Sequence, residues 1–400
     1  MDVMKNFDKK KLISYVYIAG FMLLITIPLL LINRDEDAIS EKEMRPLAKW
    51  PPILSIEDNR TTINPNLFSR IDDYIDDRIG FRNELILLNG KIQFYCFKRL
   101  ENPEKYRLGP NGESNILERD IVGTYQHKNL FSDEYLRQLA DGFEAVNTYL
   151  TSNNCKYFLF TCYDKESIYP EYFPDSVLQY GDISKTDQFI DALTSQTDVN
   201  VIDLKPSFLR LRDQYELYAP FGDAVHWTQR GAYEGYKEVM ERINSECGTD
   251  YKVLSEDDFD IEITDQGYSF FGGLSHSNYS EQFTMIKHDA VRIENIDDYY
   301  KVPEKDKDES GWLSYYRNEN AANDTKLLIF GNSYIESYIR DYFPESFSEV
   351  IFVKSYNAFE DTLPEWIESY HPDIVLSQLA ERYSDYNEIL GIAQDISSSQ

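Results

Sequence analysis

The sequence predicts an α/β fold: one doubly wound, parallel, five-stranded sheet preceded by one N-terminal transmembrane helix. Three observations support this prediction. Residues 12–33 form one long uncharged apolar run. From residue 133 onward, short apolar runs alternate with stretches of helical periodicity. Five of those runs have the length and composition of buried strands. Strands that alternate with helices favour a parallel sheet with helices on both faces.

The N-terminal apolar run is long enough to cross a membrane, because about 20 residues span the hydrocarbon layer. Four lysines lie within the first eleven residues, and acidic residues follow the run. The positive-inside rule therefore predicts a cytoplasmic tail at 1–11, a single-pass anchor at 12–33 in the cell membrane, and an extracytoplasmic domain. A cleaved signal peptide is the alternative. The run is long for a signal peptide, and no small-x-small cleavage site follows Ile32.

Composition limits the kinds of partner this chain can have. The 400 residues carry a formal net charge of −30, which repels nucleic acid and anionic lipid. Four cysteines are present, but none forms a CxxC pair, so a zinc or redox motif is not indicated. We expect four thiols, no metal and no cofactor.

The chain after the anchor divides into two parts. Residues 34–99 have the composition of a stalk followed by packing helices, and residues 100–400 form the main domain, with an irregular insertion at about 245–323. The five strands are predicted at 156–162, 199–203, 327–330, 350–353 and 374–379. The helices between them are predicted at 133–150, 187–193, 228–243, from 333, and at 363–370.

Ser333 follows a predicted strand and begins a helical stretch. Gly331 permits a sharp turn before it. A serine in this position projects from the carboxyl end of the sheet, where ligands of doubly wound sheets bind. N–H groups at the start of a helix also stabilise developing negative charge. Ser333 is therefore a candidate nucleophile; the alternative is that it only caps the helix.

A serine nucleophile needs a base, and His226 lies in a loop that runs into a helix, three residues after Asp223. A carboxylate on one imidazole nitrogen leaves the other nitrogen free to face a serine. Alternatively, Asp223 caps the helix and His226 packs beside Trp227. A metal site at this pair is a third possibility, but no further ligand lies at a suitable spacing.

The segment from Asp223 to His226, followed by a helix-opening glycine, resembles the last block of SGNH (GDSL-like) hydrolases. Because Ser333 follows these residues in the chain, their order resembles that of the circularly permuted AlgX/AlgJ-like (DHHW-type) polysaccharide O-acetyltransferases. Segments at 164–174, 271–274 and 371–382 are similar to further motifs of that family. The resemblance spans roughly residues 107–383 and implies an SGNH-hydrolase-like fold.

The resemblance also implies roles for individual residues. Ser333 would be the nucleophile, His226 the base and Asp223 the orienting acid, with one oxyanion donor from the Ser333 N–H. Asp223 lies three residues before the histidine and not two as in the permuted family, so backbone carbonyls or Asp164 are alternative orienting groups. Further oxyanion-binding or substrate-binding residues are expected at Tyr356, Asn357, Lys165, Tyr169 and Arg382.

The function implied is O-acetylation of a cell-surface or secreted polysaccharide through an acetyl-serine intermediate. The expected partners are an oligosaccharide or polysaccharide acceptor and a multi-pass membrane acyltransferase that delivers acetyl groups, with no nucleic acid. One alternative is a carbohydrate O-acetyl esterase. Another is a catalytically inactive polysaccharide-binding or assembly protein, for which 31 Tyr, 23 Phe and 4 Trp offer aromatic contacts.

Overall fold

A computed structural model of the chain divides into two compact units. The first comprises Met1–Glu101 with Gly272–Leu274, and the second comprises Asn102–Phe271 with Ser275–Gln400. The structure describes residues 9–36, 38–40, 45–57, 60–97, 104–117, 119–221, 225–265, 268–271, 274–276, 279–307, 313–382 and 385–398.

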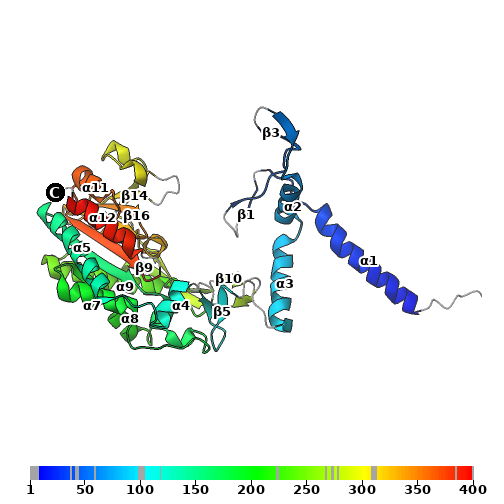
Figure 1. The fold of residues 1–400 in the computed structure, drawn as a ribbon, viewed down its shortest axis with the longest axis horizontal. Coiled ribbons are helices and arrows are strands. Elements are labelled where there is room, and N and C mark those ends of the chain that lie inside the picture. The colour runs from blue at the N-terminus through cyan, green and yellow to red at the C-terminus, as the bar shows by residue number, and fades with distance from the viewer. Residues whose placement is uncertain are drawn as a thin grey trace, which may run out of the picture. The chain divides into compact units, whose positions relative to one another are not determined.

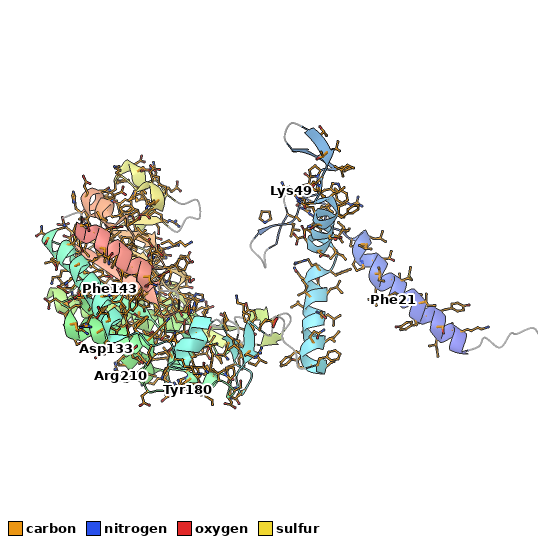
Figure 2. All side chains as sticks on the ribbon, viewed as in Figure 1. Phe21, Lys49, Asp133, Phe143, Tyr180 and Arg210 are labelled. Atoms are coloured by element: carbon orange, nitrogen blue, oxygen red, sulfur yellow. The ribbon has the colours of Figure 1, made fainter. Side chains whose placement is uncertain are left out.

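The first unit begins with the apolar helix α1 (Lys9–Leu30). Its segment Lys11–Leu30 has a mean hydropathy of 2.1 and is long and apolar enough to cross a membrane; a signal sequence would meet the same criteria. Figure 2 shows side chains projecting all round this helix, including Phe21, which is 55% exposed. A helix with apolar side chains on every side is typical of a membrane span.

The rest of the first unit is tied together by Arg78. Its buried guanidinium donates to the carbonyl oxygens of Ala48 at 2.6 Å and Asn33 at 3.2 Å. The N–H of Gly80 donates to Pro28 O at 3.0 Å, which joins the end of α1 to the turn between the next two helices. The elements are β1 (Ile39–Ser40), β2 (Arg45–Pro46), β3 (Leu54–Glu57), β4 (Arg60–Ile63), α2 (Leu67–Arg78) and α3 (Arg82–Phe97).

The second unit is built on a seven-stranded sheet in the order β13-β14-β16-β15-β17-β7-β8. Figure 1 shows helices such as α5 and α12 packed around its strands. Its five predicted strands pair in parallel. They are β7 (Lys156–Cys162), β8 (Asn200–Asp203), β15 (Lys326–Gly331), β16 (Glu349–Lys354) and β17 (Ile374–Ala380). The parallel pairing of these five strands is therefore as predicted, and β15 lies between β16 and β17.

The expectation of a purely five-stranded sheet is wrong at one edge. Two short strands, β14 (Ser314–Arg317) and β13 (Val291–Ile293), extend the sheet in antiparallel fashion beyond β16. Both lie in the stretch expected to be an irregular insertion. Strands of three and four residues are too short for periodicity to reveal them, and their pairing depends on a partner far away in the chain.

The rest of this stretch is also ordered in the part that the structure describes. Strand β9 (Phe259–Asp265) pairs with β12 (Tyr279–Met285) along seven residues. The buried guanidinium of Arg230, on helix α9 (Gln229–Cys247), holds this hairpin through Glu281 at 2.6 Å. Two shorter strands lie between them, β10 (Tyr268–Phe271) and β11 (Leu274–His276).

Helices cover both faces of the sheet, as a doubly wound fold requires. Successive residues of β7 enter different cores: Phe158 and Phe160 pack on the side of α9, and Tyr157 and Leu159 on the opposite side. This alternation is the two-residue period of a strand buried on both faces. The opposite core holds α5 (Asp133–Ser152), α7 (Lys185–Gln196), α11 (Leu363–Tyr370) and α12 (Tyr386–Ser398).

The remaining elements are short and connect these layers. They are β5 (Tyr106–Leu108), β6 (Ser114–Ile116), α4 (Arg119–Tyr125), α6 (Lys165–Ile168), α8 (Lys205–Leu211), α10 (Ser333–Glu336) and the 3₁₀ helices η1 (Pro170–Tyr172), η2 (Glu256–Asp258), η3 (Ile296–Asp298), η4 (Glu304–Asp306) and η5 (Phe343–Glu345).

Candidate active site

The turn between β15 and α10 presents Ser333. Asn332 is the N-cap of α10: its side chain accepts from Tyr334 N at 3.2 Å, and its own N–H donates to Gln378 Oε1 at 2.9 Å. A Cβ on Gly331 would lie 2.9 Å from Ile335 Cδ1, so that side chain would have to shift. The cap predicted as an alternative role of Ser333 is therefore supplied by its neighbour.

The structure brings His226 to this turn. Its Nε2 lies 3.0 Å from Ser333 Oγ, which is hydrogen-bonding distance, and both side chains are half-buried. These residues are 107 positions apart in the sequence. Because Ser333 follows the carboxyl end of β15, the pair lies at the carboxyl edge of the parallel strands, where a nucleophile and its base are expected.

The loop that carries His226 is fixed by the start of α9. Thr228 is the N-cap, and its side chain accepts from Gly231 N at 3.1 Å. The backbone packs so closely that a Cβ on Gly231 would lie 2.3 Å from Leu217 O. Trp227 is buried beside them and donates from Nε1 to Tyr334 O at 3.1 Å. Both ends of the His226 segment are therefore anchored to the core.

Two acids were candidates to orient His226. Asp223 lies outside the described residues, so its role stays a prediction. Asp164 is fully buried and forms an ion pair with Arg382. Burial raises the pKa of Asp164, while the charge of Arg382, the Tyr334 hydroxyl and the charge of His226 oppose that rise. Asp164 therefore interacts electrostatically with His226, and its described hydrogen bonds go to other groups.

The loop after β16 lies beside the nucleophile turn, because Ser355 N donates to Gly331 O at 2.8 Å. Asn357 is 5% exposed, and its N–H donates to Ser355 Oγ at 2.9 Å. Ser355 Oγ is also 2.6 Å from Glu360 Oε1. Tyr356 is 42% exposed. The backbone N–H of Asn357 is therefore occupied, which leaves its side-chain amide as the donor this residue can offer.

Three other predicted substrate-binding residues have contacts inside the fold. The Lys165 ammonium donates to Ser114 O at 2.6 Å and Ala219 O at 3.1 Å. The Tyr169 hydroxyl accepts from Leu217 N at 3.2 Å. Arg382 pairs with the buried Asp164. The contacts of Lys165 and Tyr169 hold the chain at residues 217–219, just before the His226 loop. A role of these three residues in substrate binding stays a prediction.

Sequence reasoning did not predict a role for Gln378 or Ser355. Gln378 accepts from the nucleophile turn and, with Ser377, interrupts the apolar residues of the buried strand β17. A polar side chain near the carboxyl end of a buried strand was the available signal, because buried polar groups need partners. Ser355 carries no such signal, since a serine after a strand is common in turns.

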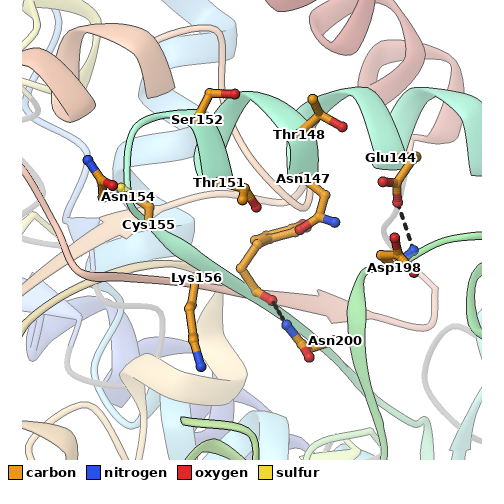
Figure 3. A pocket seen from close by; sticks show the side chains of 11 residues that line it. Glu144, Asn147, Thr148, Thr151, Ser152, Asn154, Cys155, Lys156, Asp198 and Asn200 are labelled. Carbon is orange, nitrogen blue, oxygen red and sulfur yellow. Dashed lines mark hydrogen bonds between the residues drawn. The ribbon is translucent and has the colours of Figure 1, made fainter.

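A polar pocket of about 640 Å³ lies elsewhere in the domain (Figure 3). It is lined by side chains of α5 together with Lys156 and Asn200, the first residues of β7 and β8. The amino ends of parallel strands lie at the edge opposite their carboxyl ends, so this pocket is not part of the Ser333 site. Figure 3 shows the bond from Asn200 Nδ2 to Tyr157 O at 2.8 Å across it.

The chain was compared with known proteins. Residues 124–310 match the family model described as SGNH hydrolase-like domain, acetyltransferase AlgX. This match includes His226 and ends before Ser333. No curated protein matches the chain.

The chain also matches solved structures that are distant from it in sequence. Bacillus cereus PatB1 with a sulfonyl adduct is 15% identical, covers 63% of this chain and 92% of its own, and has a TM-score of 0.48. A DHHW family protein from Eubacterium siraeum is 16% identical, covers 73% and 96%, and has a TM-score of 0.48. The O-acetyltransferase domain of Pseudomonas putida AlgJ is 14% identical, covers 76% and 100%, and has a TM-score of 0.44.

The family match falls on the α/β domain whose strand order and helical layers are described above. It covers just under half of the chain, including α5, β7, β8 and the loop that carries His226. Within the second unit, residues 124–310 are thus similar to the SGNH hydrolase-like domain of acetyltransferase AlgX.

Proposed function

We propose that this protein is a membrane-anchored, extracytoplasmic serine acyltransferase that O-acetylates a polysaccharide through an acetyl-Ser333 intermediate. The observation that carries the proposal is the 3.0 Å contact between Ser333 Oγ and His226 Nε2 at the carboxyl edge of the sheet. A serine beside a general base is the arrangement that activates a hydroxyl for attack on an acyl carbon. The match to an acetyltransferase family supports acetyl as the group transferred.

The reaction proceeds in two balanced halves. His226 Nε2 accepts the Ser333 proton as Oγ attacks the acetyl carbonyl, and the imidazolium then returns this proton to the departing alcohol of the donor. A sugar hydroxyl next attacks acetyl-Ser333 and gives its proton to His226. That proton passes to Ser333 Oγ as the acetyl ester of the sugar leaves. Asp223 is proposed to orient His226 through the other ring nitrogen.

The tetrahedral intermediates need donors for their oxyanion. The Ser333 N–H lies at the start of α10 and is the first donor. We assign the second to the side-chain amide of Asn357. This residue is buried beside the nucleophile turn, and its side chain has no hydrogen-bond partner within the described segments.

The apolar helix α1 supports the proposed location, and the proposed partners depend on that location. An anchor with its lysines in the cytoplasm places the domain outside, so the acetyl group has to be delivered across the membrane. A multi-pass acyltransferase is the proposed donor partner, and an oligosaccharide or polysaccharide is the proposed acceptor. If water reaches acetyl-Ser333 in place of a sugar, the same residues give the alternative function, a carbohydrate O-acetyl esterase.

The test uses the full chain in detergent, with 4-nitrophenyl acetate as donor and oligosaccharides as acceptors. We expect intact-mass detection of one fluorophosphonate adduct, and acetylated sugar detected by mass spectrometry. Ser333→Ala and His226→Ala should reduce acetyl transfer to background with the thermal unfolding temperature preserved. Asp223→Asn should cost up to about 10⁴-fold through a wrongly set tautomer.

Wild-type rates of both transfer and hydrolysis in Ser333→Ala would sink the enzyme proposal in favour of a polysaccharide-binding protein. A silent Asp223→Asn, with Ser333→Ala inactive, would leave the serine mechanism in place and direct the search to Asp164. Hydrolysis without any transfer would identify the esterase.

A further inference from the structure

The residue after the nucleophile connects three parts of the site. Tyr334 is fully buried, and its hydroxyl lies 2.9 Å from Val225 O, 3.1 Å from Asp164 Oδ1 and 3.0 Å from Arg382 Nη1. We propose that Tyr334, held by the Asp164–Arg382 ion pair, is the positioning residue that sets the base against the nucleophile. The proposal rests on the serine mechanism proposed above.

The bonds of Tyr334 bracket His226. Its hydroxyl donates to the carbonyl of Val225, the residue before the histidine. Its own carbonyl accepts from Nε1 of Trp227, the residue after the histidine, at 3.1 Å. The rings of His226 and Tyr334 lie 4.9 Å apart between centroids. Tyr334 therefore bonds to both residues that adjoin His226 in the sequence, Val225 and Trp227. Tyr334 is also the residue that follows Ser333.

Several hydrogen-bond acceptors surround the Tyr334 hydroxyl, and their distances indicate which one takes the phenolic proton. A phenol has one proton, and both Val225 O and Asp164 Oδ1 lie within its reach. Arg382 pairs with Asp164 and also donates to the phenol oxygen. Val225 O at 2.9 Å is nearer to the phenol oxygen than Asp164 Oδ1 at 3.1 Å and Tyr163 O at 3.3 Å, so the distances favour donation to Val225 O. Burial also raises the pKa of Tyr334 well above 10, so the hydroxyl stays a donor.

The ion pair is rigidly placed. Asp164 follows the end of β7, and Arg382 follows the end of β17, which is its parallel neighbour in the sheet. Asp164 N donates to Glu381 Oε2 at 2.9 Å, and Glu381 N donates to Cys162 O at 3.0 Å. The position of the Tyr334 hydroxyl is therefore fixed by residues that follow two neighbouring strands, β7 and β17. Its hydroxyl lies among buried groups, so Tyr334 acts through His226 and does not touch substrate.

The test compares two buried phenols in the full-length protein in detergent. Tyr334→Phe removes the hydroxyl that holds the His226 segment. Tyr370→Phe is the matched control, because Tyr370 is also fully buried and donates to Leu327 O at 3.3 Å in the core on the other face of the sheet. The first measurement is the burst of 4-nitrophenol from 4-nitrophenyl acetate. It gives the acylation rate constant and the half-saturating ester concentration. The second measurement is the thermal unfolding temperature.

We expect Tyr334→Phe to slow acylation by about 10²-fold, the size of effect that small misplacement of a catalytic group has. The half-saturating ester concentration should not change. Tyr370→Phe should lower the unfolding temperature by a similar amount and acylate at the wild-type rate. In a His226→Ala background, Tyr334→Phe should have no further effect, because a positioning residue has nothing left to position.

Three results would overturn the proposal: a wild-type acylation rate in Tyr334→Phe, an equal loss of rate in Tyr370→Phe, or a further loss in the His226→Ala background. Failure of the serine mechanism itself gives a different pattern. In that case the burst survives Ser333→Ala, whereas here Ser333→Ala abolishes it whatever Tyr334→Phe does.

Discussion

At the residue scale, the hydrogen bonds of the site separate polar groups that can contact a substrate from polar groups that already have a partner in the protein. Asn332 caps α10, so the Ser333 hydroxyl can face His226. The backbone N–H of Asn357 is used by Ser355, so its side chain is the donor left over. Neighbouring residues that look equivalent in the sequence therefore have different chemical roles.

The oxyanion assignment predicts the effect of Asn357→Ala. Removing one oxyanion donor typically costs about 10²–10³-fold in turnover, so acylation by 4-nitrophenyl acetate should slow by that factor while fluorophosphonate still labels Ser333. Ser355→Ala is the control, because it loosens the same loop without removing the amide. An equal rate loss in both variants would assign Asn357 to loop structure.

At the element scale, the close approach of α9 to the backbone of Leu217 positions the base. Gly231 lies against Leu217 O, Thr228 caps the helix and Trp227 fills the space beneath it. The helix start therefore has one allowed position, and His226 lies two residues before the cap. A helix terminus packed against backbone cannot give way as a flexible side chain would.

Gly231→Ala should destabilise the protein and displace His226. Its Cβ would lie 2.3 Å from a backbone oxygen, and overpacking of this kind costs about 1–3 kcal/mol. Urea denaturation should show this loss, together with slower acylation. Gly391→Ala in α12 is the matched control: nothing lies within 4 Å of its Cβ. It should be neutral or stabilising by up to about 1 kcal/mol. Equal stability of the two variants would contradict the packing argument.

At the scale of the whole molecule, a strongly acidic chain buries several carboxyl groups in its α/β domain. Glu381 is fully buried and accepts from Asp164 N and Ser167 Oγ. Burial, followed by the charge of Asp164, raises the pKa of Glu381 from 4.5 to about 7. Burial likewise raises the pKa of Glu216 and of Glu360 to about 7.

These pKa values predict that stability falls as pH rises from about 4.5 to 7. In that window the folded state holds protons that the unfolded state has already lost, so the stabilisation is present below pH 4.5 and is lost as pH passes 7. Unfolding temperatures measured from pH 4.5 to 8 should show this slope. Glu381→Gln should make it shallower, and the exposed Glu368→Gln should not change it. An unchanged slope in Glu381→Gln would contradict the raised pKa.

The anchor proposal predicts the side of the membrane on which the domain lies. Protease added to intact cells should digest the chain after Arg34 and leave a short membrane-bound fragment, because the lysines before the apolar run keep the N-terminus inside. Detergent-lysed cells provide the control for intrinsic resistance. A domain that is protected in intact cells and digested after lysis would overturn the proposed topology.

The sequence alone determined the α/β class, the parallel pairing of five strands and the residues that are candidates for the site. Apolar runs such as 374–379 and helical periodicity such as 228–243 are local patterns, so they can be read without the fold. The family resemblance added the pairing of Ser333 with His226. Its Asp223 lies outside the described residues, so that part of the predicted triad stays a prediction.

Only the tertiary structure decided which groups meet and which are already occupied. The contact between Ser333 and His226, the edge strands β13 and β14, and the bracket that Tyr334 forms around the base all join residues far apart in the chain. The same holds for Lys165, whose ammonium is bonded to two carbonyl oxygens inside the fold. Local sequence patterns specify which elements form. Hydrogen bonds between elements depend on distances that exist only after the chain has folded, because each buried polar group takes whichever partner packing brings within reach.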